Sequence, residues 1–280
     1  PYRRVWPSIF IEVGALFGFV TVLYIAVGIL NIGVPGALQQ PLNITIALAP
    51  LGLWLIFSRL PELRVPQPRS RLTAVLIISA LTANAISLPL LSLIEPEAWL
   101  PLAGRIQRII GYAMTVGVVQ ELSKYLVVWL LVWPLALRTR LDALAYFAAS
   151  AIGYVTVANL HLVTGGAPAD VIALRVFSNT VVHLAASSVV AYGLAELRFR
   201  SQTFFVMPFS LLLACMVAGV GISFRTALVS SGFVLGIGGT RPLFGLIFPL
   251  ALIIGVLAVV LFLFNTTERR EREAVASREI

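Results

Sequence analysis

The chain has 280 residues, of which 59% are hydrophobic and only 11% are Asp, Glu, Lys or Arg, and its mean hydropathy is +0.98. Soluble domains carry roughly 25% charged residues, so this composition excludes a water-soluble enzyme, and the high hydrophobicity excludes an intrinsically disordered chain. We therefore expect a polytopic integral membrane protein. The single cysteine, Cys215, lies in an apolar run, which excludes an intrachain disulfide and favours a small buried side chain.

Eight apolar runs follow one another along the chain, and each is long enough to cross a hydrocarbon core of about 30 Å as a helix. They cover residues 8–30, 42–58, 72–94, 106–137, 142–163, 171–197, 203–224 and 243–264. A spanning backbone must satisfy its own hydrogen bonds, and these runs do not alternate in polarity as barrel strands do. The sequence therefore predicts an all-α, polytopic transmembrane helix bundle that forms a single integral membrane domain over residues 1–280.

Basic residues are distributed unequally between the two ends of these spans. One end carries 14 arginines and the other carries 5, while Lys124 lies within a span. The first group is Arg3, Arg4, Arg59, Arg64, Arg69, Arg71, Arg138, Arg140, Arg198, Arg200, Arg269, Arg270, Arg272 and Arg278, and the second is Arg105, Arg108, Arg175, Arg225 and Arg241. The positive-inside rule makes the richer end cytoplasmic, with both termini there. The net charge of +8 then reflects topology, and no nucleic-acid partner is expected.

Three polar or irregular segments lie outside the spans. The stretch 59–71 is rich in Pro and Arg and is expected to be an extended cytoplasmic connector. The Gly-rich stretch 225–242 is compatible with a re-entrant or interfacial segment and with a flexible outer loop. The charged cytoplasmic tail 265–280 is expected to extend the last helix.

Polar residues concentrate in the fourth, fifth and sixth spans, whereas the other spans are almost purely apolar. In the fourth span Gln120, Glu121 and Lys124 lie in the middle of the run. Their spacings of three and four residues place all three on one helical face. Ionisable groups inside a membrane cost roughly 2.5–3.5 kcal/mol each on insertion scales, so the presence of Glu121 and Lys124 requires a structural or functional explanation. Two readings are open: a neutralised pair that fixes helix packing, or part of a functional site.

The fifth span carries a four-residue repeat and ends in polar residues. Asn159 and His161 lie near its outer end, and we expect His161 to be an interfacial side chain rather than a ligand. Small residues along the span allow close helix contact. The repeat consists of Tyr146, Ser150, Tyr154 and Ala158.

The sixth span carries a polar stripe on one face, formed by Arg175, Asn179, His183 and Ser187 at intervals of four residues. If this stripe faces the Glu–Lys pair, spans four to six have the chemistry of a water-accessible pocket. A carboxylate can act as general base or metal ligand, and a neutral imidazole can bind metal or activate water.

These motifs resemble the PrsW family of intramembrane (metallo)proteases, which is related to the CAAX-protease and bacteriocin-processing group. The family's Glu-Glu-x-x-Lys motif corresponds to residues 120–124, QELSK. Its second motif, Asp-Gly-x-x-Tyr-Gly followed by Gly-Phe-x-x-x-Glu-Asn, is similar to residues 142–159. Its third motif, an Arg followed eight residues later by His and then by Gly, corresponds to Arg175, His183 and Gly193.

The resemblance implies a protease-like core at 106–197, with Glu121 and His183 as base or metal ligands oriented by Lys124, Asn159 and Arg175. Two positions depart from the family pattern, because Gln120 and Ala158 stand where Glu is expected. One Glu and one His fall short of the three protein ligands usual in catalytic zinc sites. We therefore interpret the site as a relic and expect a divalent metal such as zinc only if it is active.

The residues favour a PrsW-like membrane protein that no longer hydrolyses peptides and acts as a binding or structural subunit of a membrane complex. Its expected partners are the lipid bilayer and other integral membrane proteins, and its expected location is a bacterial inner (plasma) membrane. The alternative is an active PrsW-type intramembrane protease that cleaves membrane-protein substrates. A transporter or channel is disfavoured, because the spans show no paired halves with corresponding breaks.

Overall fold

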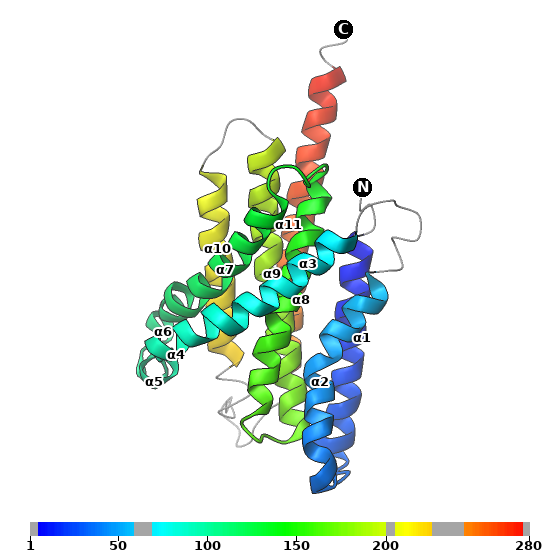
Figure 1. Ribbon diagram of the computed structural model, residues 1–280, viewed down its shortest axis with the longest axis vertical. Coiled ribbons are helices and arrows are strands. Elements are labelled where there is room, and N and C mark those ends of the chain that lie inside the picture. Colours follow the sequence, from blue (N-terminus) through cyan, green and yellow to red (C-terminus); the bar gives the residue numbers. More distant parts are fainter. Residues whose placement is uncertain (1–4, 59–68, 200–204, 226–243, 277–280) are drawn as a thin grey trace.

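The computed structural model describes residues 5–58, 69–199, 205–225 and 244–276, and this part of the chain consists of helices joined by short turns, without a strand (Figure 1). The elements are α1 (Val5–Leu23), η1 (Tyr24–Ile29), α2 (Gly36–Phe57), α3 (Arg69–Thr82), η3 (Ala83–Ser87), α4 (Leu88–Ile94), α5 (Pro96–Trp99), η4 (Leu100–Leu102), α6 (Arg105–Tyr112), η5 (Ala113–Gly117), α7 (Val118–Val132), α8 (Arg140–Val163), α9 (Ala169–Phe199), α10 (Val206–Arg225) and α11 (Phe244–Ala276).

Eight of the continuous helical stretches in the described residues are long and apolar enough to cross a membrane, which confirms the predicted fold class. Several are composite, since α1 continues into η1, and α6, η5 and α7 form one span. The stretches are Val5–Ile29, Gly36–Phe57, Ser70–Leu102, Arg105–Val132, Arg140–Val163, Ala169–Phe199, Val206–Phe224 and Leu246–Thr267.

The observed ends of several spans differ from the predicted ones; the third, for example, continues to Leu102 instead of residue 94. The second span begins at Gly36 instead of residue 42, directly after Pro35. The fourth ends at Val132 instead of residue 137, because Trp133 adopts an extended conformation (φ −75°, ψ 140°) before Pro134. Proline disfavours the helical region for the residue that precedes it, so the helix stops although the apolar sequence continues.

The structure describes only part of the segments that lie outside the spans. Helix α11 runs to Ala276, so the tail continues the last helix as far as the structure describes it. The expected connector 59–71 and the two readings of segment 225–242 fall mainly on residues 59–68 and 226–243, which lie outside the described residues. Those expectations remain predictions.

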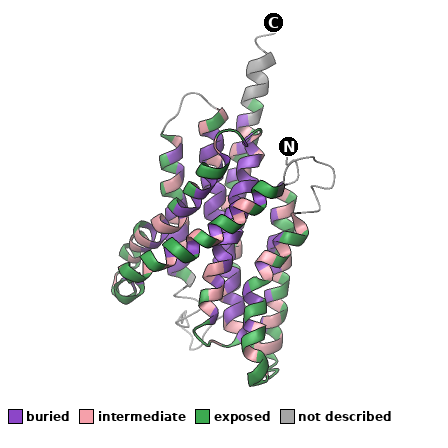
Figure 2. Cartoon of the chain, in the orientation of Figure 1, coloured by how far each residue is buried: buried purple, intermediate pink, exposed green. Residues whose placement is uncertain are grey.

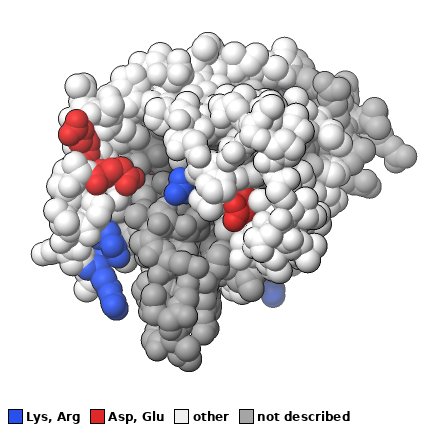
Figure 3. Space-filling model, turned by 90° about the horizontal axis from the view of Figure 1, so that it is seen from below, with Lys and Arg blue, Asp and Glu red and all other residues white. Residues whose placement is uncertain are grey.

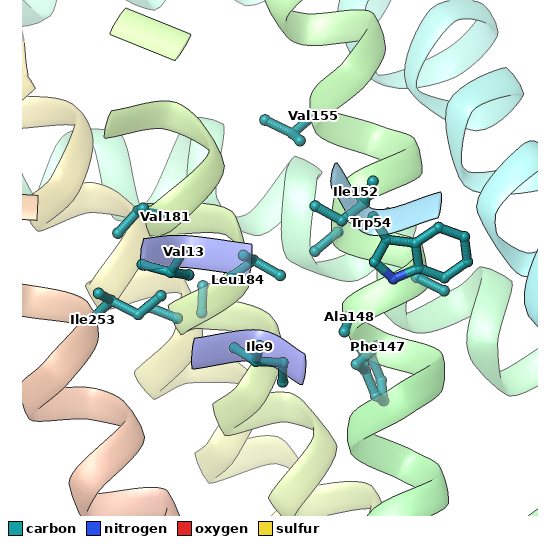
Figure 4. Packing of buried hydrophobic residues seen from close by; sticks show 14 of the residues in the cluster. Ile9, Val13, Trp54, Phe147, Ala148, Ile152, Val155, Val181, Leu184 and Ile253 are labelled. Carbon is teal, nitrogen blue, oxygen red and sulfur yellow. The ribbon is translucent and has the colours of Figure 1, made fainter. Parts of the chain in front are cut away.

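Helices α8 and α9 form the centre of the bundle. Most of their residues are buried, whereas the surrounding spans expose much of their length (Figure 2). Residues far apart in the sequence meet around them: Ile9 and Val13 of α1 lie beside Val181 and Leu184 of α9 (Figure 4). Ile253 of α11 belongs to the same cluster. The second and third motifs therefore lie on the two helices that the rest of the bundle encloses, while the first, residues 120–124, lies on α7.

Close approach of α3 to α8 depends on a glycine. A Cβ added at Gly153 would lie 2.1 Å from the carbonyl oxygen of Leu76, so only a residue without a side chain fits. Nearby, the hydroxyls of Ser79 and Ser150 are hydrogen-bonded at 2.7 Å. Small residues and hydroxyls are how membrane helices make close contacts, because lipid provides no hydrophobic drive for their association.

The first and last described helices share one end of the bundle, since α1 begins and α11 ends at the top of Figure 1. This is the end to which the 14 arginines were assigned. In the view from the opposite end, most of the described surface carries no charge, and acidic and basic side chains are few and scattered (Figure 3). The assignment of the arginine-rich end to the cytoplasm remains a prediction.

We predict that Gly153→Ala lowers stability by about 1–3 kcal/mol, the usual cost of overpacking a filled core. The obstacle is the backbone of α3, which cannot move aside as a flexible side chain can. The measurement is thermal or denaturant unfolding of the purified protein in detergent. Gly52→Ala is the matched control, because a Cβ there meets nothing within 4 Å, and equal midpoints for the two variants would contradict the packing argument.

Labelling of engineered thiols tests the predicted orientation of the chain. Glu97 and Arg138 are exposed, and they lie at opposite ends of the bundle because Glu97 precedes the fourth span and Arg138 follows it. The native Cys215 is buried. A membrane-impermeant maleimide applied to intact cells should label Glu97→Cys but not Arg138→Cys, and permeabilisation should expose the latter. The opposite pattern would overturn the predicted cytoplasmic termini.

Candidate functional site

The ionisable residues predicted from the motifs meet in the interior of the bundle, where α7 packs against α8 and α9. Glu121 and Lys124 come from α7, and His183 and Ser187 come from α9. All four are buried, with exposed fractions of 0–2%. The polar stripe therefore faces the Glu–Lys pair through His183 and Ser187.

The Lys124 ammonium is the hub of this centre. Its Nζ donates to Glu121 Oε1 at 2.7 Å and to Ser187 Oγ at 2.8 Å, and it lies 3.2 Å from His183 Nδ1. An ammonium has only donors, so Nδ1 is the acceptor and a neutral imidazole carries its proton on Nε2. The three contacts use all three donors of Lys124 and neutralise its charge with one carboxylate. Lys124 thereby bridges the two side chains expected to do chemistry.

Tyr154 of α8 completes the packing around this hub. Its ring centroid lies 5.2 Å from that of His183, and Lys124 Nζ lies 5.8 Å from the Tyr154 ring centroid. The imidazole therefore has both the ammonium and an aromatic ring as neighbours. The second carboxylate oxygen, Glu121 Oε2, is buried and has no hydrogen-bond partner among the described residues.

A second polar contact joins α8 and α9 about one turn from His183. Asn179 Nδ2 donates to Asn159 Oδ1 at 2.9 Å, and Asn159 Nδ2 approaches Thr180 Oγ1 at 3.4 Å. Arg175 begins the stripe eight residues before His183, which is about 12 Å along the helix axis. The structure therefore keeps Asn159 next to the centre as a packing residue and places the partly exposed Arg175 at the outer end of the stripe.

Gln120 and Ala158, which stand where the family resemblance expects Glu, offer no carboxylate. Gln120 is half-buried on α7, about 100° around the helix from Glu121, and carries a neutral amide. Ala158 lies one turn beyond Tyr154 on α8 and ends in a methyl group. The motif residue Asp142 has a structural role, because its Oδ2 accepts hydrogen bonds from the backbone N–H groups of Arg138 and Thr139 at the start of α8.

Several buried polar residues were not predicted from the sequence. Ser87 Oγ donates to Ser123 Oγ at 2.9 Å, which ties η3 to α7 beside the centre. Glu12 is buried in α1, so the first span is not purely apolar, and its Oε1 has no hydrogen-bond partner among the described residues. A carboxylate in an otherwise apolar run was the signal that should have identified Glu12.

An ion pair between Arg140 and Glu196 was also missed. It is buried and joins the beginning of α8 to the last turns of α9, and Arg140 lies against the Phe199 ring with its guanidinium carbon 5.6 Å from the ring centroid. From the sequence alone, Arg140 is one of the 14 arginines at the arginine-rich end of the spans. Since the two residues are 56 positions apart, spacing along one helix could not have revealed the pair.

The donor set does not suit a catalytic divalent metal. Among the residues that the structure describes, no three His, Cys, Asp or Glu side chains gather closely enough to hold an ion. Glu121 and His183 are joined by the Lys124 ammonium, so a metal between them would meet a like charge and displace two hydrogen bonds. Catalytic zinc usually has three protein ligands and one open position.

The fold and the centre together define a polytopic helical membrane protein with a buried Glu–Lys–His cluster on its central helices. Residues 67–220, more than half of the chain, match the family described as PrsW family intramembrane metalloprotease. The chain therefore belongs to the PrsW family, as the motifs had suggested, and the match extends from the connector before α3 into α10. The chain matches no curated protein and no solved structure.

We predict that Lys124→Met is strongly destabilising, by about 3–5 kcal/mol, because it leaves the Glu121 carboxylate buried without its counter-ion. The double variant Glu121→Gln/Lys124→Met should recover much of this loss, since it removes both charges. The measurement is unfolding in detergent of the wild type, Glu121→Gln, Lys124→Met and the double variant. Together these give the interaction free energy between Glu121 and Lys124. Additive effects would show that the pair contributes no specific stabilisation.

Proposed function

We propose that this chain is a non-catalytic PrsW family member that serves as a binding or structural subunit of a membrane complex. The observation that carries the proposal is the Lys124 ammonium, which is hydrogen-bonded to both Glu121 and His183. A base or metal ligand must offer a lone pair to water or metal. Here one carboxylate oxygen and one imidazole nitrogen already accept from lysine.

The altered motif positions support the same conclusion. The matched family is described as metalloproteases, yet Gln120 and Ala158 supply an amide and a methyl group where Glu is expected. Loss of a general base or ligand typically costs orders of magnitude in rate, so one altered position would already impair hydrolysis. In contrast, motif residues with structural roles are present and make contacts: Asn159 beside the centre and Asp142 at the start of α8.

A role in a complex is supported by α11. This helix continues to Ala276, beyond the end of its membrane-spanning stretch at Thr267 (Figure 1). Terminal segments rarely keep regular structure unless something holds them, and a projecting helix offers a surface to a neighbouring protein. We place the protein in a bacterial inner membrane with both termini in the cytoplasm.

One observation favours the alternative of an active intramembrane protease. Glu121 Oε2 is buried and lacks a hydrogen-bond partner among the described residues, so this oxygen is available to polarise water. In that mechanism Glu121 would act as general base, and Lys124 and His183 would stabilise charge that develops on the substrate carbonyl. Measured activity of the unaltered chain distinguishes the two functions.

We predict that purified wild-type protein in proteoliposomes does not cleave membrane-protein substrates and retains no stoichiometric zinc. Gln120→Glu/Ala158→Glu should gain zinc affinity and, if the remaining scaffold is competent, peptidase activity. The measurements are metal content by mass spectrometry and cleavage of a transmembrane substrate. The matched control is the same double variant with Glu121→Gln, which should lose any gain.

The proposal is overturned if the wild type cleaves a membrane substrate and either Glu121→Ala or His183→Ala abolishes the cleavage. Purification of the tagged chain from native membranes tests the subunit role separately. A fixed set of integral membrane proteins in constant ratio supports it. Isolation of the chain alone, under mild detergent that preserves other complexes of that membrane, argues against it.

A further inference from the structure

A second buried glutamate, Glu12 of α1, lies in the bundle away from the Glu–Lys–His cluster. Its side chain is 2% exposed, and its Oε1 has no hydrogen-bond partner among the described residues. In this it differs from Glu121, whose Oε1 accepts a hydrogen bond from the Lys124 ammonium at 2.7 Å. The described ion pairs of the interior do not include Glu12.

Apolar side chains surround Glu12 on the inward face of α1. Ile9 and Leu16 point within about 60° of Glu12 around the helix axis, and both are buried. Val13, the next residue, lies beside Leu184 in the middle of α9 (Figure 4). The carboxyl group is therefore enclosed by hydrocarbon, where an ionised form is poorly solvated.

Two of the helices around α1 carry no charge at this depth. α1 packs against α2, which contains no Asp, Glu, Lys, Arg or His. The Trp6 ring of α1 also contacts Phe264 of α11, whose charged residues all follow Thr267 and so lie beyond the spanning stretch. Neither helix supplies a counter-ion to Glu12.

The charged residues of α8 and α9, which also pack against α1, are placed elsewhere. Arg140 is ion-paired with Glu196, and His183 lies against Lys124 of α7. The other acidic, basic and histidine residues of these two helices lie within about two turns of a helix end, and they are Asp142, His161, Asp170, Arg175 and Arg198.

A buried carboxyl group in such surroundings is accommodated in its neutral form. The cost of moving an isolated carboxylate out of water is so large that the group takes up a proton instead. A bound metal ion is a poor substitute for the proton, because hard cations need several oxygen ligands. Among the described residues, no three His, Cys, Asp or Glu side chains gather to provide them.

We propose that Glu12 is a proton-binding site, whose carboxyl group is held as the neutral acid by the packing of α1 against α8 and α9. Glutamate in water is ionised at neutral pH, so one proton is taken up when Glu12 passes from water into the packed bundle. The site requires no hydrolytic activity and no partner protein. Its failure or success is therefore independent of the function proposed for the Glu–Lys–His cluster.

The test is infrared spectroscopy of the full chain in lipid bilayers at neutral pH, where a protonated carboxyl group and a carboxylate absorb at separate frequencies. The wild type should show the C=O stretch of a protonated carboxyl group. Glu12→Gln should remove this band, and Glu12→Asp should keep it at a shifted frequency. Glu97→Gln is the matched control, since Glu97 is exposed, and it should leave the protonated band intact while reducing the carboxylate absorption.

Unfolding in detergent at neutral pH gives a second readout. Glu12→Gln should leave the unfolding midpoint unchanged, because an uncharged amide replaces an uncharged acid of similar size. A buried carboxylate at this position would instead be relieved by the substitution, and the midpoint would rise.

The proposal is overturned if the wild type shows no protonated-carboxyl band at neutral pH, a result that depends on no variant. It is also overturned if Glu12→Gln leaves that band unchanged and removes only carboxylate absorption, or if the substitution raises the unfolding midpoint.

Discussion

The Lys124 ammonium inside the bundle is the interaction on which the rest of the structure depends. A charge in hydrocarbon is tolerated only with a counter-ion and hydrogen-bond acceptors close by, and Lys124 finds them in Glu121, His183 and Ser187. Because these acceptors lie on α7 and α9, their positions fix how the two helices face each other. Tyr154 of α8 then packs against the imidazole, so all three central spans meet at one charged group.

The same interaction is the main support for the proposed loss of hydrolytic function. Glu121 and His183, which the family resemblance assigns to metal or water, are here hydrogen-bonded to Lys124, and the three side chains form a neutral, buried cluster. Such a cluster can stabilise helix packing without chemistry. The PrsW match establishes the family, while Gln120 and Ala158 are the reasons to separate this chain's proposed role from that of the family.

Much of the fold followed from the sequence because apolar length alone identifies spans. All eight were located, and the main errors lay at their ends, where local chemistry decides, as at Trp133 before Pro134. Within the site, spacings of three, four and eight residues correctly placed Glu121 with Lys124 and aligned Arg175 with His183. Spacing shows which residues share a helical face, but it does not show which of them are in contact. Arg175 belongs to the same stripe as His183, yet it lies about 12 Å from it along the helix axis.

By itself, the sequence determined the class of protein, the number of spans, the family and the residues that form its polar helical faces. Periodicity within one helix was sufficient for these, because it depends only on the fixed 100° rotation per residue. Only the tertiary structure decided that Lys124 bridges Glu121 and His183, that Arg140 meets Glu196, and that Glu12 is buried among apolar side chains. Those features depend on how separate helices rotate and slide against one another, which close packing at residues such as Gly153 sets.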